Sequence, residues 1–273
     1  MVPACTRMEC VRWRPAGSAA GERALPEECA ISLTYNGGAY AVMMATPQDL
    51  EDFAFGFSLT EGIVASIAEI ERVQVIEEAL GIELRMRLAG PPGAAYAERK
   101  RYLAGPTGCG LCGIESLSEA MRPPRKVRSE TMFSPDDLMT AMDALASNQS
   151  LHRETHAVHA AGLWSPLQSA FLAVREDVGR HNALDKLAGA LAQRSLSGAD
   201  GFVVLTSRVS VEMIQKAAAI GVPLVVAVSA PTALAVRMAQ VAGVTLVAIA
   251  RRDGFETFTH SHRILQQEPA HVA

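Results

Sequence analysis

The chain has 273 residues, of which 49% are hydrophobic and 20% are charged, and its 25 basic and 29 acidic side chains leave a formal net charge of -4. Such a high apolar content and small net charge exclude a globally disordered chain, and the length suits one large domain or two modest ones. With a pI near 6.0, the chain lacks the basic field of a dedicated nucleic-acid binder.

Neither the first residues nor the longest apolar run indicates a membrane protein. The opening segment lacks the apolar core of a signal peptide, so we expect a cytoplasmic protein whose thiols stay reduced. Residues 217–236 form the longest apolar run, but Gly221, Pro223 and Pro231 interrupt it, whereas a membrane span needs about 20 nearly unbroken apolar residues. This run is expected to form buried sheet and helix in a soluble protein.

The predicted elements divide the chain into four parts. These are a flexible leader (1–27), an N-terminal β-rich subdomain with a cysteine-bearing loop at about 91–124 (28–130), a C-terminal α/β domain (131–264) and a tail (265–273). In the N-terminal subdomain, Asn36 and Gly37 tolerate positive φ and separate two apolar segments. A β-hairpin of strands 31–35 and 39–45 is therefore predicted.

A helix and a further strand follow the hairpin. The Thr46 hydroxyl suits an N-cap and Pro47 suits the first helical position, so a helix is predicted to begin there and to end near Gly62. Residues 82–88 alternate apolar and charged side chains, which predicts a strand with one exposed face. The Gly- and Pro-rich segment from 91 to 124 has no long periodic pattern, and loops of this length are usually functional.

Helices and strands alternate in the C-terminal half. Ser134 predicts a helix N-cap, and residues 155–164 and 170–174 predict paired strands. The later predicted elements are a helix from His181, a strand at 202–205, a helix at 211–219, a strand at 224–228, a helix at 233–242 and a strand at 244–250. These strands are continuous apolar runs, typical of a sheet covered by helices on both faces. The fold class is therefore predicted to be α/β (α+β), with a layered C-terminal domain.

Cys109 and Cys112 form the most informative motif. In a reducing compartment, C-x-x-C spacing suits a redox dithiol, half of a zinc site or a pair of thiols that handle sulfur, and two small packing residues are the alternative without chemistry. Glycines at 105, 108, 110 and 113 favour a deformable loop that can move a thiol from one binding site to another. Cys5, Cys10 and Cys29 are scattered, and no chemistry is predicted for them.

Redox and zinc chemistry are the less favoured interpretations of this pair. Thioredoxin-like pairs open a helix behind a strand, and no such context precedes Cys109. A zinc site would need further ligands, for which His152, His156 and His159 are the candidates. On a strand, His156 and His159 would point to opposite faces, and neither begins the His-x-Glu pattern of zinc deaminases. No zinc is therefore expected.

The residues at three predicted strand-to-helix junctions are suited to bind an anion. Free N–H groups and the positive end of the dipole bind phosphate at helix N-termini, and such junctions converge at the carboxyl ends of the strands in open α/β sheets. The candidate cofactor-binding residues there are Gly179, Arg180, His181, Asn182, Ser207, Arg208, Ser229 and Thr232. A basic segment at 251–252 follows the last strand. Together they predict a large phosphorylated ligand, while the absence of Walker A and G-x-G-x-x-G motifs disfavours an ordinary ATPase or nicotinamide enzyme.

These motifs, in this order, resemble the FdhD/NarQ family of formate dehydrogenase accessory sulfurtransferases over about residues 28–263. The resemblance rests on Tyr-Asn-Gly at 35–37, Ala-Thr-Pro at 45–47, GFSLTEG at 56–62, GCGLCG at 108–113, EDVGRHNALDK at 176–186 and VSAPT at 228–232. The chain departs from the family around residues 152–159, where the family often has a Gly-rich lead into His-Ala-Ala and this chain has Glu154, Thr155 and His156.

The resemblance implies a sulfur carrier. Such a protein takes persulfide sulfur from a cysteine desulfurase and passes it to the molybdenum cofactor, a bis(molybdopterin guanine dinucleotide), before the cofactor enters the formate dehydrogenase catalytic subunit. It implies that Cys109 holds the persulfide, with Cys112 as its loop partner. It also implies a cytidine deaminase-like fold without zinc, and a homodimer. The cofactor-binding stretch that it implies consists of Ile249, Ala250, Arg251, Arg252, Asp253 and Gly254.

Two other functions fit the same residues. One is a chaperone that binds the molybdenum cofactor without sulfur chemistry, its cysteines being structural. The other is a zinc-dependent hydrolase of deaminase-like fold. A reducible persulfide on Cys109 would separate the carrier from the chaperone, and stoichiometric zinc would favour the hydrolase.

Overall fold

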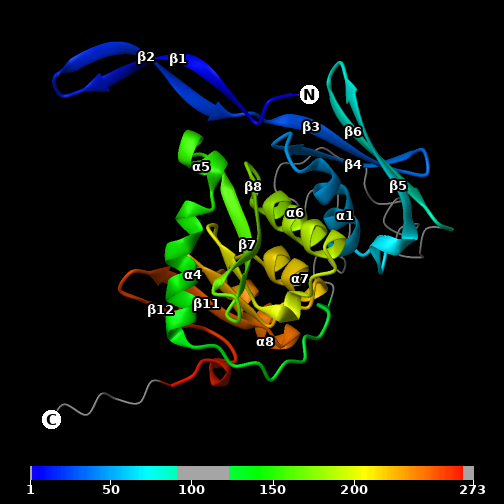
Figure 1. Ribbon diagram of the computed structural model, residues 1–273, viewed down its shortest axis with the longest axis vertical. Coiled ribbons are helices and arrows are strands. Elements are labelled where there is room, and N and C mark those ends of the chain that lie inside the picture. Colours follow the sequence, from blue (N-terminus) through cyan, green and yellow to red (C-terminus); the bar gives the residue numbers. More distant parts are fainter. Residues whose placement is uncertain (1, 91–122, 267–273) are drawn as a thin grey trace.

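The computed structural model describes residues 2–90 and 123–266, and its strands form three sheets of two, four and six strands (Figure 1). Cys109 and Cys112 lie outside the described residues. No helix within these two ranges is long and apolar enough to cross a membrane.

The six-stranded sheet has the strand order β12-β11-β10-β9-β7-β8. Its strands are β7 (His159–Ser165), β8 (Ala170–Asp177), β9 (Phe202–Leu205), β10 (Leu224–Ala227), β11 (Thr245–Arg251) and β12 (Gly254–Thr257). The central strands β9, β10 and β11 are parallel, while β7, β8 and β12 each run antiparallel to a neighbour. The parallel strands are buried throughout most of their length, as their continuous apolar sequences predict.

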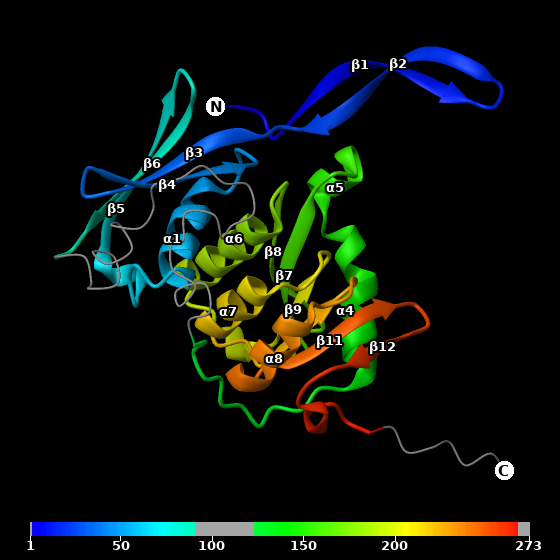
Figure 2. The ribbon, with the colours of Figure 1, turned by 180° about the vertical axis from the view of Figure 1, so that it is seen from behind.

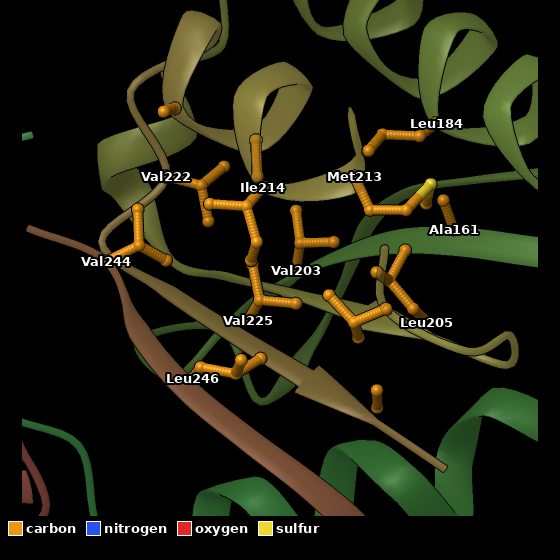
Figure 3. Close-up of a cluster of buried hydrophobic side chains, with 14 of the residues drawn as sticks. Ala161, Leu184, Val203, Leu205, Met213, Ile214, Val222, Val225, Val244 and Leu246 are labelled. Carbon is orange, nitrogen blue, oxygen red and sulfur yellow. The ribbon is translucent and has the colours of Figure 1, made fainter. Parts of the chain in front are cut away.

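Helices cover both faces of this sheet (Figure 1). On one face lie α6 (Arg180–Gln193), α7 (Val211–Ala219) and α8 (Ala233–Ala242), and on the other lies α4 (Pro135–Ser147). Figure 3 shows the core under α7, where Ile214 and Val203 belong to one buried cluster. Leu138 of α4 and Phe202 of β9 belong to the buried cluster on the opposite face. The predicted α/β (α+β) fold class is confirmed by this combination of helices and sheets.

The four-stranded sheet has the order β4-β3-β6-β5 and covers a helix of its own. Its elements are β3 (Cys29–Tyr35), β4 (Gly38–Ala45), α1 (Leu50–Thr60), β5 (Ile70–Glu78) and β6 (Gly81–Leu88). Asn36 and Gly37 have φ angles of 48° and 78° and form the predicted hairpin turn. In β6, Leu84 and Met86 are buried while Arg85 and Arg87 are exposed, which confirms the predicted one-sided strand.

Helices α1 and α6 join the two parts of the chain through glycine contacts. A Cβ at Gly56 of α1 would lie 1.7 Å from the backbone oxygen of Asp185, and a Cβ at Gly189 of α6 would lie 1.9 Å from that of Asp52. Backbone therefore packs directly on backbone, which only glycine permits at this separation. As a result, α1 lies between the four-stranded sheet and α6 (Figure 2).

Thr46 differs from its predicted role as a helix N-cap. Helix α1 begins at Leu50, after Asp49 in the left-handed region with φ 53°. The Thr46 hydroxyl instead accepts a hydrogen bond from the backbone N–H of Val178 at 3.1 Å. A partner 132 residues away competes successfully with the local capping interaction, so the helix starts one turn later.

The predicted strand at 155–164 is also corrected. Residues Ser150–Thr155 form the short helix α5, and β7 begins only at His159. The carboxylate of Glu176 accepts hydrogen bonds from the N–H groups of Leu151 and His152, both at 2.8 Å. These N–H groups at the start of α5 have no acceptor within the helix, so Glu176 stabilises its first turn. His156 ends α5 with φ 55°, so His156 and His159 do not share a strand.

The segment predicted as a flexible leader contains regular structure. Strands β1 (Cys5–Arg14) and β2 (Gly17–Pro26) pair antiparallel over ten residues each and project from the body (Figures 1 and 2). The short helices η1 (Ile67–Glu69), η2 (Gly198–Asp200) and η3 (Ser261–Arg263) complete the described elements. The division of the chain into four parts stays a prediction.

Candidate functional site

The predicted junctions meet at one edge of the six-stranded sheet. Because β9 and β10 are parallel, residues 206–210 and 228–232 leave the sheet on the same side. The two segments contact each other directly, since the N–H of Thr232 donates to the carbonyl of Val209 at 3.0 Å. We call the surface formed by residues 177–182, 206–210 and 228–232 the carboxyl edge.

The start of α6 reaches the same edge through two antiparallel strands. β7 runs antiparallel to β9, and β8 runs antiparallel to β7, with His159 opposite Asp177. Helix α6 begins at Arg180, directly after this point. The structure thus brings together all three predicted junctions, and it adds His159 to them.

A histidine–carboxylate contact links the first turns of α6 and α7 at this edge. His181 is 9% exposed, and its Nε2 lies 3.6 Å from Oε2 of Glu212. Burial alone would raise the pKa of Glu212, but His181 and the Ser210 hydroxyl, which donates at 2.6 Å, lower it to about 2. Glu212 is therefore a carboxylate at neutral pH. Its 3.6 Å separation from Nε2 of His181 is longer than a hydrogen bond, and this buried Nε2 has no hydrogen-bond partner among the described residues.

Two further cationic or ionisable groups lie beside this contact. Arg180 is half-buried, and its Nε is buried without a hydrogen-bond partner among the described residues. Burial lowers the pKa of His159, and the nearby charge of Arg180 lowers it further. Arg208 is exposed at the second junction. An anion at the edge would meet arginine side chains and the helix N-termini of α6 and α7.

Other predicted site residues serve the fold. Asn182 is buried, and its side-chain amide donates to the carbonyl of Met44 at 2.9 Å and to Asp177 at 3.0 Å. The N–H of Gly179 donates to the same carboxylate at 2.7 Å. Thr232 caps α8, because its hydroxyl accepts from the N–H of Ala235 at 3.1 Å. Ser207 is buried, and its hydroxyl donates to the carbonyl of Arg208.

The start of α6 rests on a fully buried ion pair. Nζ of Lys186 lies 2.6 Å from Oδ2 of Asp177, and both side chains are inaccessible to solvent. The same ammonium donates to the carbonyl of Thr46 at 2.9 Å, and the N–H of Thr46 donates to Asp177 at 3.0 Å. This pair fixes the carboxyl edge against the four-stranded sheet.

A second buried ion cluster joins α1, α6 and α7. Nζ of Lys216 lies 2.8 Å from Asp185 and 2.7 Å from Glu61. Burial opposes the charge of Lys216, but the two carboxylates outweigh it and raise the pKa of the ammonium above its ordinary value. Burial raises the pKa of Asp185 in turn, although Lys216 opposes this shift. The cluster thus connects three helices in the interior of the protein.

The stretch implied to bind cofactor is only partly at the edge. The N–H of Ile249 donates to the carbonyl of Ser229 at 3.4 Å, and Ile249 has a positive φ of 53° at a register shift between β11 and β12. Ala250 is 1% exposed in the core under α4. The remaining residues form the turn from β11 to β12, with Arg251, Arg252 and Asp253 exposed and Gly254 half-buried.

The histidines considered for zinc do not converge. His152 and His156 lie around α5, with ring centroids 5.5 Å apart, whereas His159 opens β7. Within residues 2–90 and 123–266, no group of three or more His, Cys, Asp or Glu side chains is arranged to hold a metal ion. Cys5, Cys10 and Cys29 are free thiols.

A cavity of about 430 Å³ lies at the opposite ends of α1, α6 and α7. Leu59, Leu191 and Ile220 line it, together with Pro123, the first described residue after the cysteine segment. The predicted site residues that the structure describes lie elsewhere. Sequence reasoning also missed Glu212 at the carboxyl edge, because an acidic residue in the first turn of a helix is typical of ordinary dipole stabilisation.

Comparison with known proteins places this fold and motif set in one family. The FdhD/NarQ family model matches residues 26–265. The sulfur carrier protein FdhD of Agrobacterium fabrum is 49% identical over 253 residues, covering 92% of this chain and 93% of that protein. Its counterpart in Brucella abortus is 50% identical over 254 residues, covering 93% and 94%.

A solved structure shows the same fold. The crystal structure of a protein assigned as a formate dehydrogenase accessory protein, from Desulfotalea psychrophila, matches with a TM-score of 0.73 at 24% identity, covering 96% of this chain and 100% of that one. The predicted family resemblance is thus confirmed by the match over residues 26–265, and the chain belongs to the FdhD/NarQ family.

Proposed function

We propose that this chain is a cytoplasmic sulfur carrier. It receives persulfide sulfur from a cysteine desulfurase and delivers it to the molybdenum cofactor before the cofactor enters the catalytic subunit of formate dehydrogenase. The observation that carries the proposal is the match, over more than nine-tenths of both chains, to relatives named sulfur carrier protein FdhD. The proposal includes the deaminase-like arrangement and the homodimer that the family resemblance implies.

Cys109 is the proposed carrier thiol. Its thiolate attacks the terminal sulfur of the persulfide on the desulfurase, the sulfur–sulfur bond of the donor breaks, and the donor cysteine leaves as a thiolate. The product is a persulfide on Cys109, and the step needs no external oxidant or reductant. For delivery, the Cys112 thiolate would attack the inner sulfur of the Cys109 persulfide: the Cys109–Cys112 disulfide forms, the sulfur–sulfur bond of the persulfide breaks, and the outer sulfur leaves as hydrosulfide for the cofactor.

The carboxyl edge is the proposed site for the guanine dinucleotide arms of the cofactor. N-terminal turns of α6 and α7 offer N–H groups and positive dipole ends to phosphate, and Arg180 and Arg208 offer guanidinium groups. Ile249 lies beside this surface through its contact with Ser229. Because the whole chain has a net charge of -4, such local groups must supply the attraction for an anionic ligand.

Intact-protein mass spectrometry tests the carrier function. After incubation with a cysteine desulfurase and cysteine, we expect an adduct of about 32 Da, one sulfur atom, that a thiol reductant removes. The Cys109→Ala variant should lose the adduct, whereas Cys10→Ala, the matched control in the N-terminal hairpin, should keep it. Absence of any adduct on the wild-type protein would refute the proposal.

A complementation assay separates the carrier from a cofactor chaperone. In a strain lacking its own accessory protein, Cys109→Ala should fail to restore formate dehydrogenase activity although the variant accumulates to the wild-type level. Full restoration by this variant would show that cofactor binding alone suffices. In that case the cysteines would have no role in sulfur transfer.

A further inference from the structure

His181 has a buried ring nitrogen that forms no hydrogen bond. Its side chain is 11% exposed, and its Nε2 is buried without a hydrogen-bond partner among the described residues. The exposed part of the side chain therefore belongs to other atoms than Nε2. A buried polar atom without a partner costs free energy, so its presence at the carboxyl edge indicates a functional role for this ring.

This nitrogen faces a charged acceptor. Oε2 of Glu212 lies 3.6 Å from Nε2 and accepts a hydrogen bond from the Ser210 hydroxyl at 2.6 Å. Because the pKa of Glu212 is lowered to about 2, its carboxylate can only accept at neutral pH, so an attractive contact requires a hydrogen on Nε2. In a neutral imidazole that hydrogen leaves Nδ1 as an acceptor, whereas in a protonated ring both nitrogens donate.

The contact lies between two helix N-termini. His181 is the second residue of α6 and Glu212 is the second residue of α7. Four residues further along, Asp185 and Lys216 join the same two helices again, so the helices lie side by side. The positive ends of both dipoles are therefore close to His181. They oppose a positive charge on the ring, and a bound anion would remove this opposition.

The other charged groups around His181 do not supply such an anion. Arg180 adds a positive charge on α6, and its Nε is buried without a partner among the described residues. On β7, burial and the charge of Arg180 lower the pKa of His159, which favours its neutral form. The carboxylates of the neighbouring elements are paired with lysines, namely Asp177 of β8 with Lys186, and Asp185 of α6 and Glu61 of α1 with Lys216.

We infer that the carboxyl edge binds a phosphate-bearing ligand together with one proton, and that His181 takes up this proton. In the bound state, Nε2 of the imidazolium donates to Glu212 and Nδ1 donates to a phosphate oxygen, and no covalent bond forms or breaks. The inference rests on the proposed placement of the guanine dinucleotide arms at this edge. It adds that their affinity decreases as the pH rises, by up to about tenfold for each pH unit over which the proton is taken up.

Isothermal titration calorimetry of the full chain with GDP-mannose tests the inference. The phosphates of this probe are diesters and lack the second ionisation near pH 6 of a phosphate monoester. Any proton taken up between about pH 6.5 and about pH 8.5 is therefore bound by the protein. Titrations in two buffers of different ionisation enthalpy count this uptake. For the wild type we expect uptake that approaches one proton at the alkaline end, and affinity that decreases with pH.

Two variants assign the proton to the contact between His181 and Glu212. His181→Gln keeps a polar side chain but should take up no proton, and at about pH 6.5 it should bind the probe about tenfold to a hundredfold more weakly than the wild type. Glu212→Gln should reduce the uptake, because it removes the negative charge that favours the imidazolium. His262→Gln is the matched control, since His262 is an exposed histidine in η3, and it should behave like the wild type. Urea unfolding verifies that each variant is folded.

The outcomes separate this inference from the proposed function. Binding by the wild type without proton uptake, uptake that persists in His181→Gln, or uptake that is lost only in His159→Gln would overturn the inference and leave the placement of the cofactor intact. A wild-type chain that does not bind the probe at any pH would refute the placement and the inference together. The persulfide adduct on Cys109 should form equally in His181→Gln, because sulfur loading does not involve the carboxyl edge.

Discussion

Replacing Lys216 by methionine tests how much the buried ion cluster stabilises the protein. Lys216 is 6% exposed and its partner Asp185 is 1% exposed, so the variant leaves a buried carboxylate without its cation. Removing one partner of a buried ion pair costs about 3–5 kcal/mol. Because native proteins are stable by only about 5–15 kcal/mol, we expect Lys216→Met to lose a large part of the free energy of unfolding.

The pH dependence of this loss follows from the pKa of Asp185. Burial already raises this pKa above the ordinary value of 3.8 while Lys216 opposes the shift, so removing Lys216 raises it further. At pH values between the ordinary pKa of 3.8 and the raised pKa, Asp185 of the folded variant keeps a proton that the same carboxyl group has released in the unfolded chain. Stability falls with rising pH wherever the folded state binds more protons. The decrease in the free energy of unfolding caused by Lys216→Met should therefore be small near pH 3.8 and should reach its full size above the raised pKa of Asp185.

Urea unfolding, followed by circular dichroism across this pH range, measures the effect. Lys216→Met should be compared with Asp185→Asn and with the double variant, which removes both charges. The double variant should recover much of the lost stability and should lack most of the pH dependence, because Asp185, the fully buried carboxylate of this cluster, is then replaced and only the half-buried Glu61 remains. A loss below about 1 kcal/mol, within the range of ordinary surface ion pairs, or a loss that does not vary with pH, would refute this account.

Three further predictions concern packing, acid stability and ligand binding. Gly189→Ala should destabilise the protein by about 1–3 kcal/mol or more in urea unfolding, because its Cβ would lie 1.9 Å from the backbone oxygen of Asp52. The pKa of Glu212 is lowered from 4.5 to about 2 in the folded protein, so the wild type loses the stability that this carboxylate contributes as the pH falls through that range. Glu212→Gln should lack this contribution at neutral pH, and unfolding measured as a function of acid pH detects the difference. Arg208→Ala should weaken GDP binding about tenfold to a hundredfold in calorimetry, while Arg237→Ala, on the exposed side of α8, should leave the affinity unchanged.

Local sequence patterns were sufficient where the energetics are local. The helices at 211–219 and 233–242 and the strand at 202–205 form with the predicted bounds, because apolar runs and capping residues such as Thr232 act within a few positions of each other. The turn at Asn36 and Gly37 was predicted correctly for the same reason, since its positive φ angles depend on those two residue types.

The errors occur where distant residues provide the hydrogen bonds. Thr46 has the type of an N-cap residue, yet it binds Val178, and α5 depends on Glu176, a residue more than 20 positions away. A single sequence contains no direct signal for such pairings. Glu212 at the carboxyl edge was missed similarly, because its significance depends on His181, which belongs to another helix.

The motif at 176–186 combines inward-pointing structural groups and groups of the carboxyl edge in one segment, and this combination fixes the position of the edge. Asp177, Asn182 and Lys186 point inward. Asp177 and Lys186 form an ion pair, and all three form hydrogen bonds with the backbone at the end of β4, at Met44 or Thr46. Arg180 and His181, between them in the chain, lie at the carboxyl edge. Since the inward groups fix the first turn of α6 from behind, Arg180 and His181 keep a constant position at the carboxyl edge. Under the proposed function, a ligand bound there would be held in a fixed orientation for the transfer of sulfur, as efficient group transfer requires.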